Sequence, residues 1–469
     1  MKKIIITSAT MTLAALLIAP KFIGNTLQSQ LDEVVIALDK HPIYGAEVIS
    51  YQRGWFHSKG EIALSIKVND VLAAQQGVPL AQADNPTVIA SFSVNHGPVY
   101  AGDAIGLGRA HFVIDIPGNE FREHLQWDAD TPFYHNEGAI GLFGGLSYDD
   151  VVPSFAAELE EQDLAVSFSG YQGTARSEGD AIHYEGITTM LSMQLEAATI
   201  TLSDLDINMT TYGDVMAAIN GEIFESDAQV AIDTLTLEGE ESVALNDMLL
   251  SSSSTLSEDG KLASVNLDYA IASLVADDFT ANDLSIGIAA NNLDTDFIKA
   301  YQKFNNETLS TSVLALPEKV ETLVENHLLP FLTASPEFNI TSLSGTFPEG
   351  TLDAHLNSKV VNVDALPAAL DDASFWLKHM AADSRIKADK AVAQWMVTSY
   401  VTSQLMATPQ AQGLTPEELN AVVAQQVPMV LQTFVQQGIL VENDESYEAE
   451  LVLKDGNASV NGTTVPIPL

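Results

Sequence analysis

Beyond Pro42, apolar and polar side chains alternate along much of the chain. Residues 62–68, 88–94 and 110–116 all show this period of two. The pattern is typical of half-buried antiparallel strands, because successive side chains of a strand face opposite sides of the sheet. The sequence therefore predicts a large antiparallel β-rich body.

A finer pattern recurs through the middle of the chain: two polar residues separate two apolar-x-apolar triplets. A strand that keeps its alternation on both sides of one extra residue must switch faces unless a β-bulge restores them. Asn and Asp tolerate the backbone angles of such a site. The alternative is a tight turn between two short strands, and in either case the sheet should curl. The polar pairs are Asn69-Asp70, Ser203-Asp204, Asp233-Thr234, Asn246-Asp247 and Asn282-Asp283.

Helical spacing of apolar residues marks three other regions. Residues 25–38 predict a helix near the N-terminus, and Pro367 opens a helical region that we expect to run to about Met406. Thr415-Pro416-Glu417-Glu418 is a capping box that starts another helix, which Gly438 ends. The sequence thus predicts an α+β protein, with a cytoplasmic tip and membrane anchor in residues 1–24, a curled β-rich region in 25–310 and an α+β C-terminal region in 311–469.

The N-terminus has the pattern of a membrane anchor. Lys2 and Lys3 precede an apolar stretch that ends at Ala19. A cleavable signal peptide starts in the same way, but it needs a small-x-small cleavage site. Pro20 follows Ala19, and Phe22 lies two positions before Gly24, so we predict an uncleaved signal-anchor with its lysines in the cytoplasm. The anchor residues are Ile4, Ile5, Ile6, Leu13, Leu16, Leu17 and Ile18.

Charge and cysteine content exclude several classes of function. The chain has 63 Asp and Glu against 20 Lys and Arg, a net charge of −43, which repels nucleic-acid phosphates. The acidity fits either a surface for cations or basic partners, or the general bias of proteins that work in salty water. The chain has no cysteine, which excludes disulfides, thiol catalysis and Cys-ligated metals.

Motifs of catalysis and cofactor binding are absent from the sequence. It has no His-x-x-x-His or His-Glu-x-x-His metal spacing, no Gly-x-Ser-x-Gly elbow, and no Gly-Lys-Ser/Thr after the glycines at 138–145. We therefore predict no catalytic, cofactor-binding or metal-binding residues, and no enzymatic activity.

Three short motifs resemble the YdgA/YihF-type family of bacterial envelope proteins. They are the segment 51–58, the triplet 96–98 at a strand end, and a closing turn near residue 461. The resemblance implies inner-membrane attachment, an extracytoplasmic body and self-association, and it supplies no catalytic residues. The motif residues are Tyr51, Arg53, Gly54, Trp55, Phe56, His96, Gly97, Pro98, Asn461 and Gly462.

These observations predict a single-pass protein of the bacterial inner membrane, with most of the chain in the periplasm and a structural or interaction role. The alternative is a module that binds a lipid or another apolar ligand on its curled sheet. The expected partners are the inner membrane, a second copy or another envelope protein, and a lipid. Nucleic acid is not among them.

Overall fold

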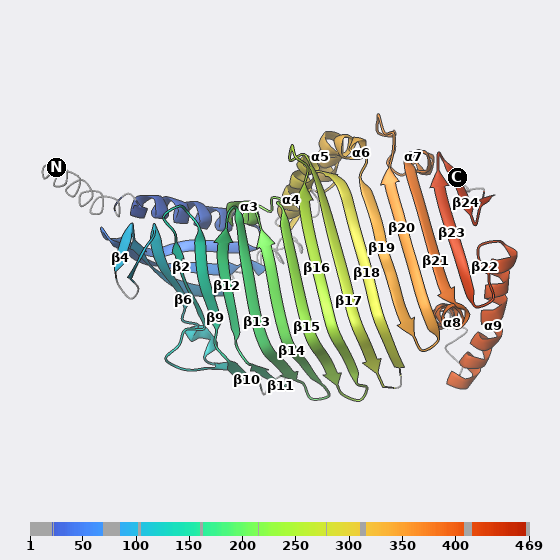
Figure 1. Cartoon of the computed structure of the whole chain (residues 1–469), viewed down its shortest axis with the longest axis horizontal. Helices are drawn as coiled ribbons and strands as arrows, with labels where there is room; N and C mark the ends of the chain where they lie inside the picture. Colours follow the sequence, from blue (N-terminus) through green and yellow to red (C-terminus); the bar gives the residue numbers. More distant parts are fainter. Residues whose placement is uncertain are drawn as a thin grey trace, which may run out of the picture. The chain divides into compact units, whose positions relative to one another are not determined.

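The computed structural model describes residues 21–465, apart from residues 22, 69–84, 102–104, 160–162, 214, 278, 310–315 and 408–414 (Figure 1). The predicted anchor residues and Asn69-Asp70 lie outside the described residues. No helix in the described part of the chain is both long enough and apolar enough to cross a membrane.

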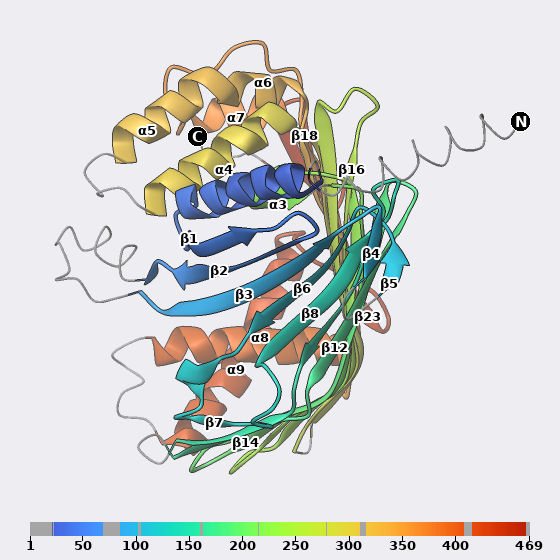
Figure 2. The same cartoon turned by 90° about the vertical axis from the view of Figure 1, so that its left-hand side faces the viewer.

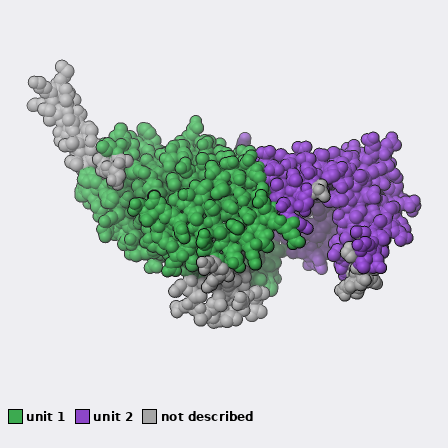
Figure 3. Space-filling model, turned by 90° about the horizontal axis from the view of Figure 1, so that it is seen from below, with its two compact units in different colours: residues 1–240, 298–325 green, residues 241–297, 326–469 purple. Residues whose placement is uncertain are grey.

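The described chain is mostly β, and it divides into two compact units (Figure 3). Unit 1 consists of Met1–Glu240 and Ile298–Glu325. Unit 2 consists of Glu241–Phe297 and Asn326–Leu469. Each unit contains antiparallel strands, as the alternation predicts.

The strands of unit 1 form a sheet that bends into a trough (Figure 2). Its pairing order is β1-β2-β3-β6-β8-β9-β12-β13-β14-β15, with β11, β10 and β7 continuing from the second half of β13. β4 and β5 form a separate hairpin. The strands are β1 (Tyr44–Arg53), β2 (His57–Ile66), β3 (Thr87–His96), β4 (Val99–Ala101), β5 (Ile105–Leu107), β6 (Ala110–Ile116), β7 (Leu125–Gln126), β8 (Tyr134–Ile140), β9 (Leu146–Val152), β10 (Phe155–Leu159), β11 (Leu164–Phe168), β12 (Tyr171–Glu178), β13 (Ala181–Gln194), β14 (Thr199–Thr211) and β15 (Ser226–Glu238).

A helix over residues 23–40 lies beside β1 and confirms the predicted N-terminal helix (Figure 2). Its apolar side, including the buried Val35, packs on the protein, whereas Asp32 and Glu33 are exposed. Unit 1 also contains η1 (Asn119–Phe121), α3 (Val215–Ile219), α5 (Leu316–Leu323) and most of α4 (Thr295–Leu309).

In unit 2 the pairing runs β16-β17-β18-β19-β20-β21-β23-β24-β25, and β22 also pairs with β23. The strands are β16 (Val243–Leu256), β17 (Leu262–Ala276), β18 (Phe279–Asp294), β19 (Glu337–Phe347), β20 (Gly350–Val360), β21 (Met380–Asp389), β22 (Val441–Glu442), β23 (Ser446–Lys454), β24 (Asn457–Val460) and β25 (Thr463–Val465). The helices are η4 (Val324–Leu328), α6 (Leu329–Thr333), α7 (Ala373–His379), α8 (Lys390–Met406) and α9 (Pro416–Gln436).

The capping box of unit 2 is confirmed, and one helical prediction is wrong. Thr415 accepts from the backbone N–H of Glu418, whose side chain reaches back to the backbone of Thr415. The predicted helical region from Pro367 to Met406 is interrupted by β21, which pairs with β20 and β23 on its two sides. Ladder hydrogen bonds with two neighbours override the local helix propensity of this alanine-containing segment.

None of the four described polar pairs is a tight turn, and one of them, Asn282-Asp283, coincides with a shift of register. β14, β15, β16 and β18 each run through their pair without a break. Asp204, Asp247 and Asp283 have left-handed φ values of 47°, 49° and 51°. The ladders β14–β15, β16–β17 and β17–β18 keep their register across these residues, with Asp204 opposite Asp233 and Ala272 between Asp247 and Asp283. On the other side of β18, the register with β19 shifts between Asn282 and Ser285, as a β-bulge at this pair predicts. The tight-turn alternative is therefore wrong.

The two units differ in how their apolar residues pack. Three clusters of buried residues occur in the described part of unit 2, including Val401, Val423, Val427 and Leu431 between α8 and α9. Among the described residues of unit 1, the buried hydrophobic ones are mostly alanines, with Val35 and Tyr100 as the larger exceptions. The larger apolar side chains of unit 1 remain half-buried, which leaves its sheet with a partly open face.

Candidate functional site

Glycines and aromatic rings alternate across the inner face of the unit 1 trough. A Cβ on Gly60 would come within 2.7 Å of the Phe92 ring, and one on Gly138 within 2.6 Å of the Phe112 ring. A Cβ on Gly173 would lie even closer to the Tyr184 hydroxyl, and one on Gly186 even closer to the Tyr171 hydroxyl. The rings thus lie over glycines of neighbouring strands, which allows a strongly bent sheet to carry large side chains on its inner face.

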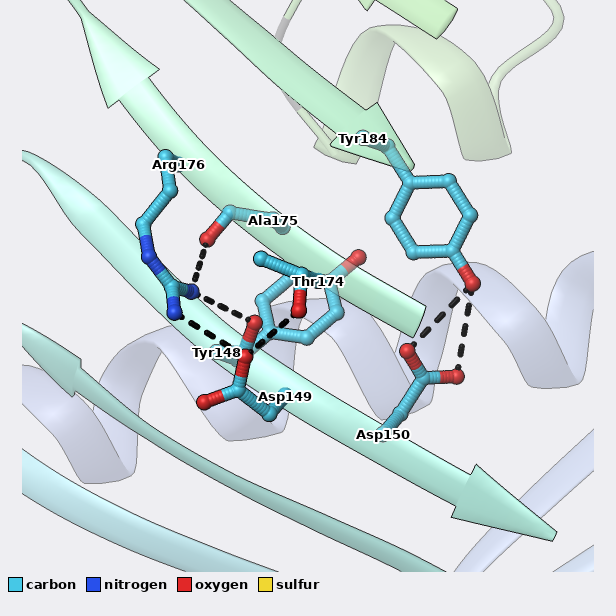
Figure 4. Close-up of polar contacts among 7 residues, drawn as sticks. All are labelled: Tyr148, Asp149, Asp150, Thr174, Ala175, Arg176 and Tyr184. Carbon is cyan, nitrogen blue, oxygen red and sulfur yellow. Dashed lines mark hydrogen bonds and ion pairs between the residues drawn. The ribbon is translucent and has the colours of Figure 1, made fainter. Parts of the chain in front are cut away.

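A buried carboxylate lies among tyrosines in the middle of this face. Asp150 of β9 is 6% exposed, and the Tyr184 hydroxyl lies 3.3 Å from its Oδ1 and 3.5 Å from its Oδ2, where it donates a hydrogen bond (Figure 4). Tyr171 contacts the Tyr184 hydroxyl in turn. Burial raises the pKa of Asp150, and burial together with the charge of Asp150 raises the pKa of Tyr134 to about 12. The hydroxyls therefore stay protonated and donate toward the carboxylate.

The neighbouring Asp149 faces the opposite side of the sheet (Figure 4). Its Oδ1 accepts from Thr174 at 2.7 Å and from Arg176 at 2.9 Å. The hydrogen bond from Thr174 and the charge of Arg176 lower the pKa of Asp149. Both side chains of this ion pair are more than half exposed, so it contributes little to stability.

We expect the side chain of Asp150 to make the protein less stable as pH rises, which is opposite to the usual effect of a carboxylate. The substitution Asp150→Asn should remove this effect. Because burial raises the pKa of Asp150 in the folded state, its protonated form is the stabilising one, and that contribution is lost as pH rises above the ordinary value of 3.8 through the raised pKa. The free energy of unfolding of the wild type should therefore fall relative to that of D150N as pH rises. Urea unfolding at a series of pH values measures this difference.

Asp149→Asn is the matched control for that experiment. The folded-state pKa of Asp149 is lowered, so its stabilising contribution is present above 3.8 and is lost as pH falls. A difference between wild type and D150N that does not change with pH, or that has the sign expected for D149N, would contradict the buried position of Asp150.

The first two motifs come together at one end of the trough. His96, 1% exposed, lies with its Nε2 2.9 Å from Ser58 Oγ and its Nδ1 3.3 Å from the carbonyl oxygen of Trp55. Tyr51 donates to the same Ser58 hydroxyl at 3.2 Å. The backbone N–H of His96 donates to the Phe56 carbonyl at 2.8 Å. The segment 51–58 and the triplet 96–98 therefore form one packed junction.

The same junction holds the start of the helix of residues 23–40. Arg53 donates to the side chains of Asn25 and Gln28, and Lys21 lies 5.2 Å from the centre of the Trp55 ring. A Cβ on Gly24 would come within 2.5 Å of the His96 ring. The motif residues thus fix the point at which the N-terminal segment meets the sheet.

The remaining motif residues have separate places. Gly54 closes the β1–β2 turn, where its N–H donates to the His57 carbonyl at 2.7 Å, and the Gly97–Pro98 peptide bond is cis. Asn461 and Gly462 belong to unit 2 and form the β24–β25 turn with positive φ values. The Asn461 amide donates to the carbonyls of Gly438 and Ile439, which ties the end of α9 to this turn.

An apolar pocket opens on the inner face near the far ends of β1, β2 and β3. Its volume is about 600 Å³, within the range of small-molecule sites. Leu38 reaches it from the helix, Leu64 and Val88 from the sheet, and Phe121 from η1. Phe121 packs edge-on against Phe133, whose ring contacts Phe155. The pocket thus adjoins a row of aromatic rings that begins at Phe121.

A second pocket of about 600 Å³ in unit 1 is lined by lysines. Lys40, Lys67, Lys299 and Lys303 contribute to it, although the whole chain has only 20 Lys and Arg. Leu38 and Ile66 of the apolar pocket lie close in sequence to Lys40 and Lys67 of this one. Glu222 and Glu307 also line the pocket and partly compensate its positive charge, and Glu307 lies 3.9 Å from Lys303. Lys67 is paired with Asp39, at 3.6 Å.

Sequence reasoning missed the tyrosines, the buried aspartate and both pockets. Asp150, Tyr171 and Tyr184 lie on three strands, and only the sheet register brings them together. The described residues contain no group of three or more His, Asp or Glu arranged to hold a metal ion. Chemically, the site offers an apolar surface, a lysine-lined pocket and a satisfied polar cluster.

The chain is similar to a family of bacterial proteins and to a protein of Escherichia coli. A model of the family described as bacterial protein of unknown function (DUF945) matches residues 1–468. Protein YdgA of Escherichia coli (strain K12) is 25% identical over 321 residues, which cover 63% of this chain and 60% of YdgA. The match therefore spans less than two thirds of that relative's length. No solved structure matches the chain.

Proposed function

Since the chain belongs to the DUF945 family of bacterial proteins, as its YdgA-like motifs predicted, we propose a function from its own structure: it is a non-enzymatic envelope protein whose first unit binds an apolar ligand of the lipid class. In this proposal residues 4–19 anchor it in the inner membrane, and both units lie in the periplasm. The sequence predictions of a signal-anchor and of an acidic, cysteine-free body support this location.

The apolar pocket on the inner face of the unit 1 trough is the observation that carries the proposal. A domain with a purely structural role is expected to fill its core with side chains. Unit 2 does so with its three buried clusters, and its pockets of about 500 and 590 Å³ are lined mostly by polar side chains. Unit 1 instead keeps an apolar pocket of about 600 Å³ between Leu38, Leu64, Val88 and Phe121. Covering this surface with a ligand would remove apolar area from water, at roughly 25 cal/mol per Å².

The lysine pocket indicates the polar end of such a ligand. In a chain of net charge −43, four lysines and two glutamates line this pocket, and its excess of positive charge favours an anion. Lys67 directly follows Ile66, which lines the apolar pocket. We infer an amphipathic ligand that has an apolar chain and an anionic group.

The substitution Val88→Arg should remove the bound ligand. A charged side chain in the apolar pocket would be desolvated by an acyl chain, so we expect the amount of bound lipid to fall by about tenfold or more. The measurement is mass spectrometry of the lipids that copurify with the full chain in mild detergent.

Ile89→Arg provides the matched control, since Ile89 is the next residue of β3, faces the other side of the sheet and is 36% exposed. Lipids that surround the anchor contribute equally to both variants, so the difference between V88R and I89R reports on the pocket. Equal lipid content in the two variants would refute the ligand site and leave the structural role as the better explanation.

A further inference from the structure

Seven apolar side chains stand exposed at the motif end of unit 1, and we call them the apolar tip. Phe143 is 99% exposed, Ile105 84% and Leu107 70%. They lie on the β8–β9 turn and on the β4–β5 hairpin, which projects from the main sheet (Figure 2). Contiguous exposed apolar surface of this kind marks an interaction site. The apolar tip comprises Trp55, Phe56, Val99, Ile105, Leu107, Leu142 and Phe143.

Backbone hydrogen bonds join the loops of the apolar tip into one surface. His96 N–H donates to the Phe56 carbonyl, and Gly97 N–H donates to the Arg109 carbonyl at 2.8 Å. Gly108 N–H donates to the Pro98 carbonyl, which closes the base of the β4–β5 hairpin. Arg109 N–H donates to the Ile140 carbonyl at 2.7 Å, directly before the turn that carries Leu142 and Phe143. The loops are thus held together.

Cations are concentrated at this tip, although the chain is strongly acidic. Lys21 lies over the Trp55 ring, and Arg53 lies two residues before Trp55. The Arg109 Nε donates to the Leu142 carbonyl at 3.0 Å, next to Phe143. A surface with an aromatic and aliphatic centre and cations around it is complementary to the interface of a bilayer with anionic headgroups.

The described chain also enters the fold at the apolar tip. Lys21, which contacts Trp55, is separated from the apolar stretch of residues 4–19 only by Pro20. A segment that crosses the membrane and ends beside Trp55 would bring the tip to the headgroup layer. We propose that the apolar tip docks on the lipid surface of the membrane in which the chain is anchored, and so fixes the orientation of unit 1. This inference rests on the membrane attachment proposed above.

Single cysteines in the full chain test the docking directly, because the chain has no native cysteine. Phe143→Cys and Ile105→Cys introduce nitroxide labels at exposed tip positions. Ala129→Cys is the matched control, since Ala129 is exposed and precedes β8, whereas Phe143 follows β8, at the opposite end of the strand. The labelled proteins are reconstituted into phosphatidylethanolamine vesicles with and without phosphatidylglycerol.

The readout is the collision rate of each label with oxygen, which concentrates in lipid, relative to a water-soluble nickel complex. We expect a several-fold higher oxygen-to-nickel ratio at positions 143 and 105 than at 129, and a larger ratio with phosphatidylglycerol because of the tip cations. Equal ratios at positions 143 and 129 in protein that floats with the vesicles would overturn the docking and leave the attachment intact.

Two other outcomes would also overturn the proposal. Labels at 143 that are shielded from both reagents and broadened by a second label nearby would show that the apolar tip binds another copy of the chain. Protein that does not float with vesicles would refute the membrane attachment and the docking together. Neither outcome bears on the pocket at Val88, which the lipid analysis tests separately.

Discussion

Gly97→Ala is expected to destabilise unit 1 more than the same substitution at any other described glycine of that unit. A Cβ at this position would overlap the carbonyl oxygen of Gly108 and lie 2.7 Å from its carbonyl carbon and 3.1 Å from the Arg109 oxygen. These are backbone atoms, so relief requires the β4–β5 hairpin to move away from β3. We expect a loss of about 3 kcal/mol in the free energy of unfolding, at the upper end for overpacking, measured by urea denaturation.

Gly145→Ala is the control for that substitution. Its Cβ would meet only the Cβ of Ser177, at an ordinary 3.7 Å. Its free energy of unfolding should remain within about 0.5 kcal/mol of the wild-type value. If G97A were as stable as G145A, the close approach of residues 97 and 108 would not exist in solution.

The second large effect is expected from His96→Ala. The ring fills the junction between Ser58, Trp55 and Gly24, so its removal leaves a cavity and takes a hydrogen-bond partner from a buried hydroxyl. Together these effects should cost about 2–4 kcal/mol. The exposed His57, whose Nδ1 lies 3.2 Å from Asn95 Oδ1, provides the control, and H57A should cost less than about 1 kcal/mol.

His96 should also make the stability of the wild type sensitive to acid. Burial lowers the pKa of His96, and the charges of His57 and Arg53 lower it further. The neutral ring is therefore the stabilising form, and its contribution is present above the ordinary value of 6.5 and is lost as pH falls through the lowered pKa. The difference between wild type and H96A should shrink between pH 7 and pH 5. A constant difference would contradict the buried position of the ring.

Local patterns predicted the strands and caps, but not the partners of each strand. The alternation over residues 110–116 corresponds to β6, and the capping box at Thr415 is formed by neighbouring residues. β21 was missed because its strand character depends on ladders with β20 and β23, which are distant in sequence. The helix and strand propensities of neighbouring residues contain no information on such pairing.

The candidate site could be predicted only in part, because its residues meet through the pairing of strands. The motifs of segment 51–58 and triplet 96–98 could be recognised, but the contact between Ser58 and His96 depends on β2 and β3 being neighbours. Asp150 and its tyrosines have no sequence signal, since nothing near Asp150 distinguishes it from the exposed Asp149. Burial of a single carboxylate follows from the bend of the whole sheet.

The left-handed residues Asp204, Asp247 and Asp283 inside long paired strands have a consequence for how this protein can change over evolutionary time. Because the ladders β14–β15, β16–β17 and β17–β18 keep one register on both sides of these residues, the deletion of one residue from one strand would set every later pair out of step. Insertions and deletions within these strands must therefore occur in adjacent strands together or not at all. Descendants of this chain are free to vary their loops, but they inherit the length of their strands as a group.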